Sequence, residues 1–195
     1  MPRPDVQPGS DLTGRLRTLL GKRGTAILVV TLVAAVLRFW GLGYPPNRVF
    51  DEAFYPRSAC WLLGWSDLRC DVKDGRLADW VHPPLGKYAI ALGELALGFD
   101  ASDGLNERDT LSFRLPSAVA GTVTVSLLTF AASMLFESVA WAWLAGVLFA
   151  VEGLSVVHSR VGMLDAFLAL WVVAAFVAFL LDQAAEERRH SSSSD

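Results

Sequence analysis

The sequence predicts an all-α integral membrane protein with four transmembrane helices, and composition and apolar segment lengths are the main reasons. Of its 195 residues, 53% are hydrophobic and 19% are charged, with a mean hydropathy of +0.39. A soluble domain carries about 25% charged residues, so this composition indicates a membrane protein. The basic residues form no stripe interleaved with aromatic residues, so no nucleic-acid partner is expected.

Four apolar stretches are long enough to cross a bilayer. A transmembrane helix needs roughly 20 mostly apolar residues, with about 17 as the lower limit. The predicted spans are residues 24–42, 114–136, 139–157 and 164–181. Together they define a transmembrane domain over 24–181, with a long external loop over 43–112 and a polar cytoplasmic tail over 182–195.

The charge distribution predicts the orientation. Residues 1–23 carry five basic residues against two aspartates, which places this segment in the cytoplasm and the first loop outside the cell membrane. A cleaved signal peptide is the alternative, but no small-x-small cleavage site follows the first apolar stretch.

A shorter stretch, "LGKYAIALGELALGF" over 85–99, is interrupted by Glu94. Its length suits an amphipathic helix lying in the membrane interface better than a crossing. In that case Asp51 and Glu52 emerge on the same outer face as residues 158–165. If the stretch crossed the membrane, the two polar clusters would face opposite sides.

The external loop also contains the only two cysteines, Cys60 and Cys70. Outside the cytoplasm they could form a disulfide, and two unrelated thiols remain an equal alternative. No Cys/His spacing suggests zinc. Clustered carboxylates can bind Mg²⁺ or Mn²⁺ through oxygen, but interspersed arginines make a metal less necessary. We therefore predict neither a metal nor another cofactor.

Several charged residues are expected near the outer membrane surface. Each has a structural alternative: solvated loop acids, an arginine extending to the interface, helix caps, or an ion pair formed by a carboxylate at membrane depth. The set comprises Asp51, Glu52, Glu152 and Asp165 with Arg38, His82, Lys87, Arg114, His158 and Arg160.

Taken together, these residues suit transfer of a sugar from a polyprenyl phosphate. The lipid lies in the bilayer, while the anomeric carbon of the sugar lies at the interface. Cationic side chains can hold the departing phosphate, and a carboxylate can accept the proton of an attacking hydroxyl. Phosphate is already a good leaving group, so a strong general acid is unnecessary.

The motifs "FDEAFY", "VHPPLGKYAIAL", "FRLPSAVAGTVTV" and "VEGLSVVHSRVGMLDAF", in this order, resemble the protein O-mannosyltransferases. These are polyprenyl-phosphate-dependent membrane glycosyltransferases of the GT-C type. The resemblance covers roughly residues 25–181 and implies a GT-C-like fold with interfacial amphipathic helices in the first external loop. Met163 stands where the family usually has Leu. Family members carry about ten or eleven spans, so this chain resembles their N-terminal part, which we expect to be inactive alone.

The resemblance implies an inverting transfer of mannose from polyprenyl-phosphate mannose to Ser or Thr of an exported protein, with the translocon as the place of encounter. By similarity, Asp51 and Glu52 form the catalytic acidic pair. The donor phosphate would be held by Arg38, Arg114 and Arg160, and the supporting residues would be His82, Lys87, Glu152, His158 and Asp165.

Two alternatives remain open. The first keeps a polyprenyl-phosphate donor but transfers another sugar, or transfers it to a lipid or wall glycan. The second is a non-enzymatic four-helix membrane protein, for which polar residues lining the helix faces would be expected. The second and fourth predicted spans carry no such polar line, which disfavours it.

Overall fold

The computed structural model describes residues 21–72 and 82–193, and within these ranges every regular element is helical. The all-α prediction is therefore confirmed for the described residues. The elements are α2 (Arg23–Phe39), the short 3₁₀ helix η1 (Phe50–Ala53), α3 (Tyr55–Leu62), α4 (Asp67–Cys70), α5 (Pro84–Leu97), α6 (Glu107–Leu135), α7 (Val139–Val151), α8 (Gly153–Ser159) and α9 (Asp165–Ser193).

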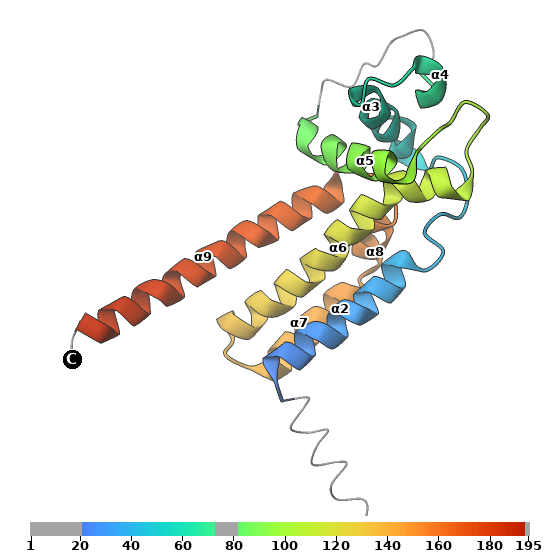
Figure 1. Ribbon diagram of the computed structural model, residues 1–195. Coiled ribbons are helices and arrows are strands. Elements are labelled where there is room, and N and C mark those ends of the chain that lie inside the picture. The colour runs from blue at the N-terminus through green and yellow to red at the C-terminus, as the bar shows by residue number, and fades with distance from the viewer. Residues whose placement is uncertain (1–20, 73–81, 194–195) are drawn as a thin grey trace, which may run out of the picture.

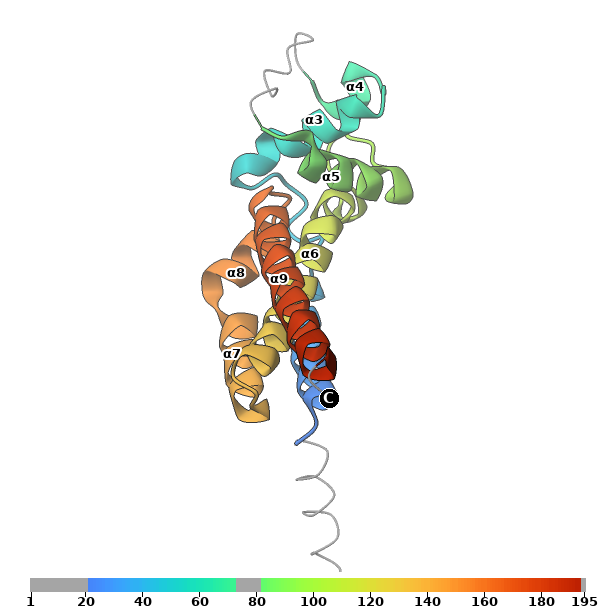
Figure 2. The same ribbon diagram turned by 90° about the vertical axis from the view of Figure 1, so that its left-hand side faces the viewer.

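Helix α6 is the centre of the bundle and contacts α2, α5, α7, α8 and α9. Figures 1 and 2 show α2, α6 and α7 side by side, whereas α9 diverges from α7 along its length. Glycines permit the closest approaches. A Cβ on Gly146 of α7 would lie 2.4 Å from Thr129 Oγ1 of α6, and a Cβ on Gly121 of α6 would lie 2.3 Å from Ser159 Cβ of α8. Small residues at such crossings are typical of packed membrane helices.

By length and composition, α6 and α9 could each cross a membrane, and α7 with α8 could make a third, broken span. The structure thus supports a membrane protein with two or three candidate spans. Helix α2 has 17 residues, or about 25 Å at 1.5 Å per residue, which is the lower limit for a crossing. The count of four spans stays a prediction.

The largest differences from the predicted boundaries concern three segments. The third span is not one helix over 139–157, because the chain bends by 59° at Glu152, whose carboxylate caps α8. Helix α6 begins at Glu107, not at residue 114, because Asn106 and Asp109 form a reciprocal capping box. Helix α9 continues beyond residue 181 to Ser193.

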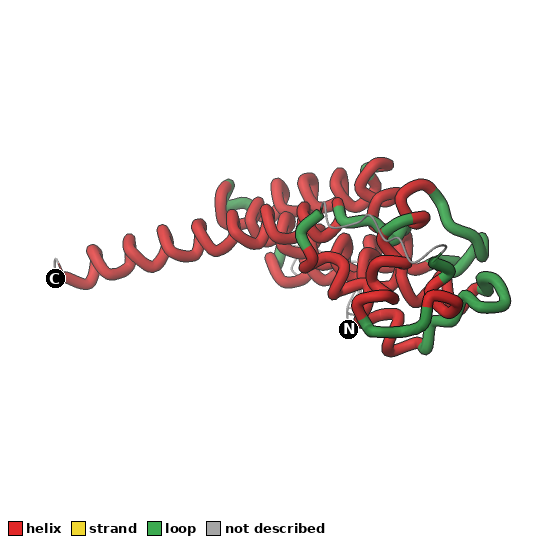
Figure 3. The backbone as a smooth tube through the Cα atoms, turned by 90° about the horizontal axis from the view of Figure 1, so that it is seen from above, coloured by secondary structure: helices red, strands yellow, loops and turns green. Residues whose placement is uncertain are grey.

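Helix α5 lies across one end of the bundle and not alongside the long helices (Figure 1). It packs on α3 and α6, and it has 14 residues, too few for a span by the same length test. Seen from above, most of the loops lie on the side of the molecule opposite the C-terminal end of α9 (Figure 3). The arrangement fits a helix lying flat in the interface, and its depth in a membrane stays a prediction.

The external loop packs against α6 and α9 in a small hydrophobic core that includes Ile90, Phe99 and Phe113. Within this core, Cys60 of α3 and Cys70 of α4 form a disulfide with a Cα–Cα distance of 5.5 Å. The structure therefore shows the bond that the sequence left open. A crosslink over a separation of 10 residues stabilises by about 3 kcal/mol, chiefly by restricting the unfolded chain. Disulfides persist in oxidising compartments, which agrees with an external loop.

Glu94 of α5 is fully buried, and within the described chain neither carboxylate oxygen has a hydrogen-bond partner. Burial raises the pKa of Glu94 from 4.5 to about 9, and the charges of Arg48 and Arg69 offset only part of this rise. The folded protein thus keeps a proton that the unfolded chain releases above pH 4.5. The contribution of this proton to the free energy of unfolding is fully present below pH 4.5, and it is lost progressively as the pH rises towards 9.

Replacing Glu94 with Gln should therefore stabilise the protein at neutral and alkaline pH, by about 3 kcal/mol at pH 7, and should have little effect below pH 4.5. Thermal unfolding in detergent at pH 4.5, 7 and 9 measures this. Glu186→Gln, at an exposed position of α9, is the matched control. An equal gain from Glu94→Gln at all three pH values would contradict the prediction.

Candidate active site

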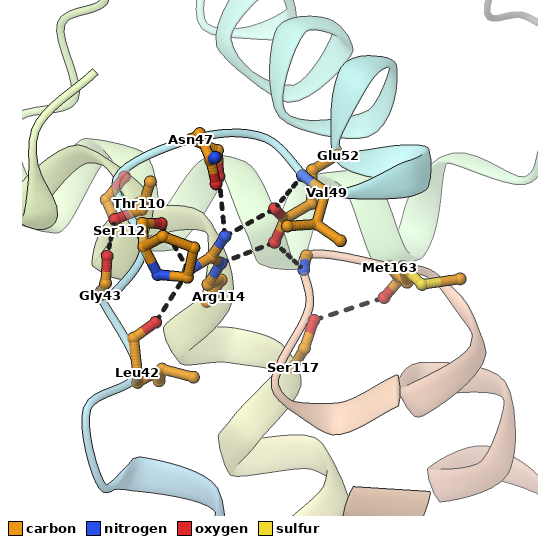
Figure 4. Close-up of polar contacts among 12 residues, drawn as sticks. Leu42, Gly43, Asn47, Val49, Glu52, Thr110, Ser112, Arg114, Ser117 and Met163 are labelled. Carbon is orange, nitrogen blue, oxygen red and sulfur yellow. Dashed lines mark hydrogen bonds and ion pairs between the residues drawn. The ribbon is translucent and has the colours of Figure 1, made fainter. Parts of the chain in front are cut away.

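A buried ion pair between Glu52 of η1 and Arg114 of α6 lies at the centre of the candidate site (Figure 4). The Arg114 Nε donates to Glu52 Oε1 at 2.8 Å, and Nη2 donates to Oε2 at 2.9 Å. The two side chains are 3% and 0% exposed. This bidentate geometry is the strongest form of an Arg–carboxylate contact.

Arg114 also organises the loop that follows α2. Its remaining N–H groups donate to the backbone carbonyls of Leu42, Pro45 and Asn47 at 3.1, 3.2 and 2.9 Å. A guanidinium has five N–H donors, and all five are used here. In this geometry Arg114 has no donor left for a substrate phosphate, so it holds the loop in place.

Glu52 is equally saturated. Besides Arg114, it accepts hydrogen bonds from the backbone N–H of Val49 and of Gly162, each at 2.8 Å. It therefore connects the loop before η1 with the turn between α8 and α9. Gly162 allows this approach, because a Cβ there would lie 2.9 Å from the Phe113 ring. A carboxylate with four donors around its two oxygens has no free lone pair for an incoming proton.

Asp51 is adjacent in sequence but lies in a different environment. It is partly exposed, and its carboxylate forms no hydrogen bond or ion pair with any described residue. The preceding residue, Phe50, has a φ of 51°, a left-handed conformation that is costly for a bulky side chain. This kink and the 3₁₀ turn leave Glu52 buried and Asp51 accessible.

Arg38 and Arg160 connect α2 to the broken helix. Arg38 is fully buried and donates to Ala150 O at 3.2 Å and to Ser155 Oγ at 2.9 Å, across the break between α7 and α8. Arg160 donates through Nη1 to Leu37 O at 2.8 Å, at the end of α2. Its Nε and Nη2 have no hydrogen-bond partner among the described residues.

Two pockets adjoin this region. One, of about 190 Å³, is lined by Thr124 and by Glu152, Ser155, His158 and Asp165. The other, of about 370 Å³, lies between α3, α5 and α9, and its lining includes Tyr55, His82, Leu168 and Trp171. Asp165 lines both pockets, so it stands at their boundary.

Of the predicted supporting residues, His158 Nδ1 lies 4.0 Å from Asp165 Oδ2, and the His82 ring lies 5.5 Å from that of Tyr55. Glu152 caps α8 and does not pair with an arginine at hydrogen-bond distance. Lys87 is 4% exposed and lies on the inner face of α5.

Over 21–72 and 82–193, no three His, Cys, Asp or Glu residues are grouped so that they could hold a metal ion.

Sequence reasoning missed Gly162, whose N–H joins Glu52 to the α8–α9 turn. It also missed a second cluster, in which Asp71 pairs with Arg48 and Arg57. The positions of Arg48 and Arg57 on either side of the acidic pair were the available signal, but nothing in the sequence indicated Asp71 as their partner.

Comparison with known proteins decides the family. The family model described as dolichyl-phosphate-mannose-protein mannosyltransferase matches residues 72–194. The chain belongs to this mannosyltransferase family. The membership confirms the resemblance and disfavours a non-enzymatic protein. No solved structure matches the chain.

Curated relatives in the mannosyltransferase family carry the same kind of name. The polyprenol-phosphate-mannose–protein mannosyltransferase of Mycolicibacterium smegmatis is 34% identical over 158 residues, which cover 80% of this chain and 28% of the relative. That of Mycobacterium tuberculosis is 33% identical over 83% of this chain and 30% of the relative. The dolichyl-phosphate-mannose–protein mannosyltransferase 4 of Saccharomyces cerevisiae is 28% identical over 79% of this chain and 20% of the relative. The chain thus spans less than a third of these relatives.

Proposed function

We propose that this chain is the N-terminal part of an enzyme that transfers mannose from polyprenyl-phosphate mannose to Ser or Thr of an exported protein. Transfer takes place at the outer face of the cell membrane, with the translocon as the place where the acceptor is met. The family and the names of the relatives support the reaction class. The observation that carries the assignment to this site is the contrast between a saturated Glu52 and an unpaired, accessible Asp51.

In this proposal Asp51 is the general base. Its carboxylate accepts the proton of the acceptor hydroxyl as the hydroxyl oxygen attacks the anomeric carbon. The bond from that carbon to the phosphate oxygen breaks, and the phosphate leaves with the electron pair. A single displacement of this kind inverts the configuration at the anomeric carbon.

The three arginines predicted to hold the donor phosphate then have different roles. Arg160 keeps two unpaired guanidinium nitrogens and could donate to the departing phosphate. Arg114 and Arg38 act through the backbone, by holding the loop before η1 and the break before α8. Glu52 is a positioning residue and not a second base.

The topology belongs to the same proposal. We take α2, α6, the broken pair α7–α8, and α9 as four spans, with residues 1–23 and the end of α9 in the cytoplasm. The loop with Asp51 and the α8–α9 turn then share the outer side, and their contact through Glu52 and Gly162 supports this placement.

The experiment that tests the function uses the full-length protein in membranes with labelled polyprenyl-phosphate mannose. One reaction offers a Ser/Thr peptide, and others offer lipid acceptors and wall-glycan fragments. We expect label on the peptide, with an inverted linkage. Label on lipid or glycan alone would replace this proposal with transfer to those acceptors, and label from another sugar donor would overturn the choice of mannose.

A further inference from the structure

Three consecutive residues before the kink at Phe50 are each held by a different charged group. Arg114 binds the carbonyl of Asn47, and Glu52 binds the N–H of Val49. Between them, the side chain of Arg48 extends to Asp71, with Nη1 2.5 Å from Oδ2. The backbone leading to Asp51 is thus fixed on one side by α6 and on the other by the α3–α4 segment.

Asp71 lies where it can hold two parts of the loop together. It ends α4 in a left-handed conformation, with a φ of 52°, directly after the disulfide-bonded Cys70. The same Oδ2 that receives Arg48 also receives Arg57 Nη2 of α3 at 2.6 Å. Partial burial alone would raise the pKa of Asp71, but the hydrogen bonds from Arg57 and Arg48 outweigh it and lower the pKa.

No other described side chain forms a hydrogen bond or ion pair with Arg48. The Nε and Nη2 of Arg48 are buried and have no hydrogen-bond partner within the described ranges. Glu94 is the other acid whose charge would reach Arg48, but burial keeps it protonated at neutral pH. Asp71 is therefore the one negative charge among the described residues that anchors Arg48.

We infer that Asp71 is a positioning residue for the catalytic loop, acting on Asp51 through Arg48, and that the Cys60–Cys70 disulfide holds Asp71 in place for this role. The inference rests on the proposed function of Asp51 as the base. Helix α4 has only four residues, so the disulfide supplies the rigidity that the helix itself lacks. Small displacements of a reacting group are enough to slow a reaction about 100-fold.

The first test replaces Asp71 with Asn in the full-length enzyme. The amide keeps the shape but removes the charge that orients two guanidinium groups. We expect kcat to fall at least about 10-fold, with the KM for the donor within about 2-fold of wild type.

Asp103→Asn is the matched control, since Asp103 is an exposed acid in the same external loop and its replacement should leave kcat unchanged. Unchanged kcat in Asp71→Asn, whatever its thermal stability, would overturn the inference. Failure of the proposed function has a different signature, because Asp51→Asn would then retain activity.

The second test needs no change at Asp71. A membrane-impermeant phosphine reduces the disulfide of the native full-length enzyme to two thiols, which is verified by alkylation and mass spectrometry. We expect kcat to fall at least about 10-fold and to recover on reoxidation. The double variant Cys60→Ser/Cys70→Ser should show the low kcat and no response to the phosphine. Full activity with both thiols verified as reduced would remove the disulfide from the proposal.

Discussion

Replacing Asp51 with Asn in the full-length enzyme should lower kcat for mannosyl transfer by about 10²–10⁴, the range that a general base contributes. The amide cannot accept the hydroxyl proton, although it has nearly the same shape. Because the Asp51 carboxylate forms no hydrogen bond or ion pair with a described residue, thermal stability and donor binding should stay close to wild type.

The measurement is steady-state transfer to a Ser/Thr peptide, together with thermal unfolding of the purified variant. Asp103→Asn again serves as the control for loss of one external negative charge. A variant that keeps its activity would remove the base assignment. A variant that unfolds would show that Asp51 has a structural contact after all.

Replacing Glu52 with Gln should, unlike Asp51→Asn, cause a large loss of thermal stability. Arg114 would remain buried with its charge uncompensated, and breaking a buried pair from one side costs about 3–5 kcal/mol. The hydrogen bond from the Gly162 N–H would also weaken, which releases the α8–α9 turn from the loop before η1.

A double-mutant cycle measures the interaction energy between Glu52 and Arg114. Glu52→Gln, Arg114→Met and the double variant are compared by thermal unfolding in the full-length protein. We expect the double variant to be less destabilised than the sum of the single variants, because each single change leaves a buried partner unpaired. Additive losses would contradict the ion pair as the source of stability. A Glu52→Gln enzyme of normal stability but with no activity would reinstate Glu52 as a catalytic group.

The helices could be predicted from the sequence because their cause is local. An apolar stretch of sufficient length must satisfy its backbone polar groups internally when it lies in a bilayer, and a helix does this within one segment. The prediction that α5 lies in the interface and does not cross the membrane rests on its length of 14 residues and on Glu94 within it. The break at Glu152 was missed because its charge at membrane depth suggested an ion pair, whereas the carboxylate caps α8.

The residues of the candidate site were proposed from the sequence, but their contacts could not be. Asp51 and Glu52 carry the same functional group, and no local pattern separates a neighbouring pair of acids. Their difference depends on partners 62 and 110 residues later in the chain, Arg114 and Gly162. The same holds for Arg38. Its partner, the carbonyl of Ala150, is available because α7 ends at Val151.

The sequence by itself determined an all-α membrane protein, its family, and the set of charged residues around the first external loop. Those conclusions depend on composition, segment length and motif order, which do not require knowing which residues meet. Only the tertiary structure decided which carboxylate is saturated, which arginine keeps free donors, and that Asp71 holds Arg48. Such assignments arise from desolvation and hydrogen-bond geometry between distant segments, and these exist only once the chain has folded.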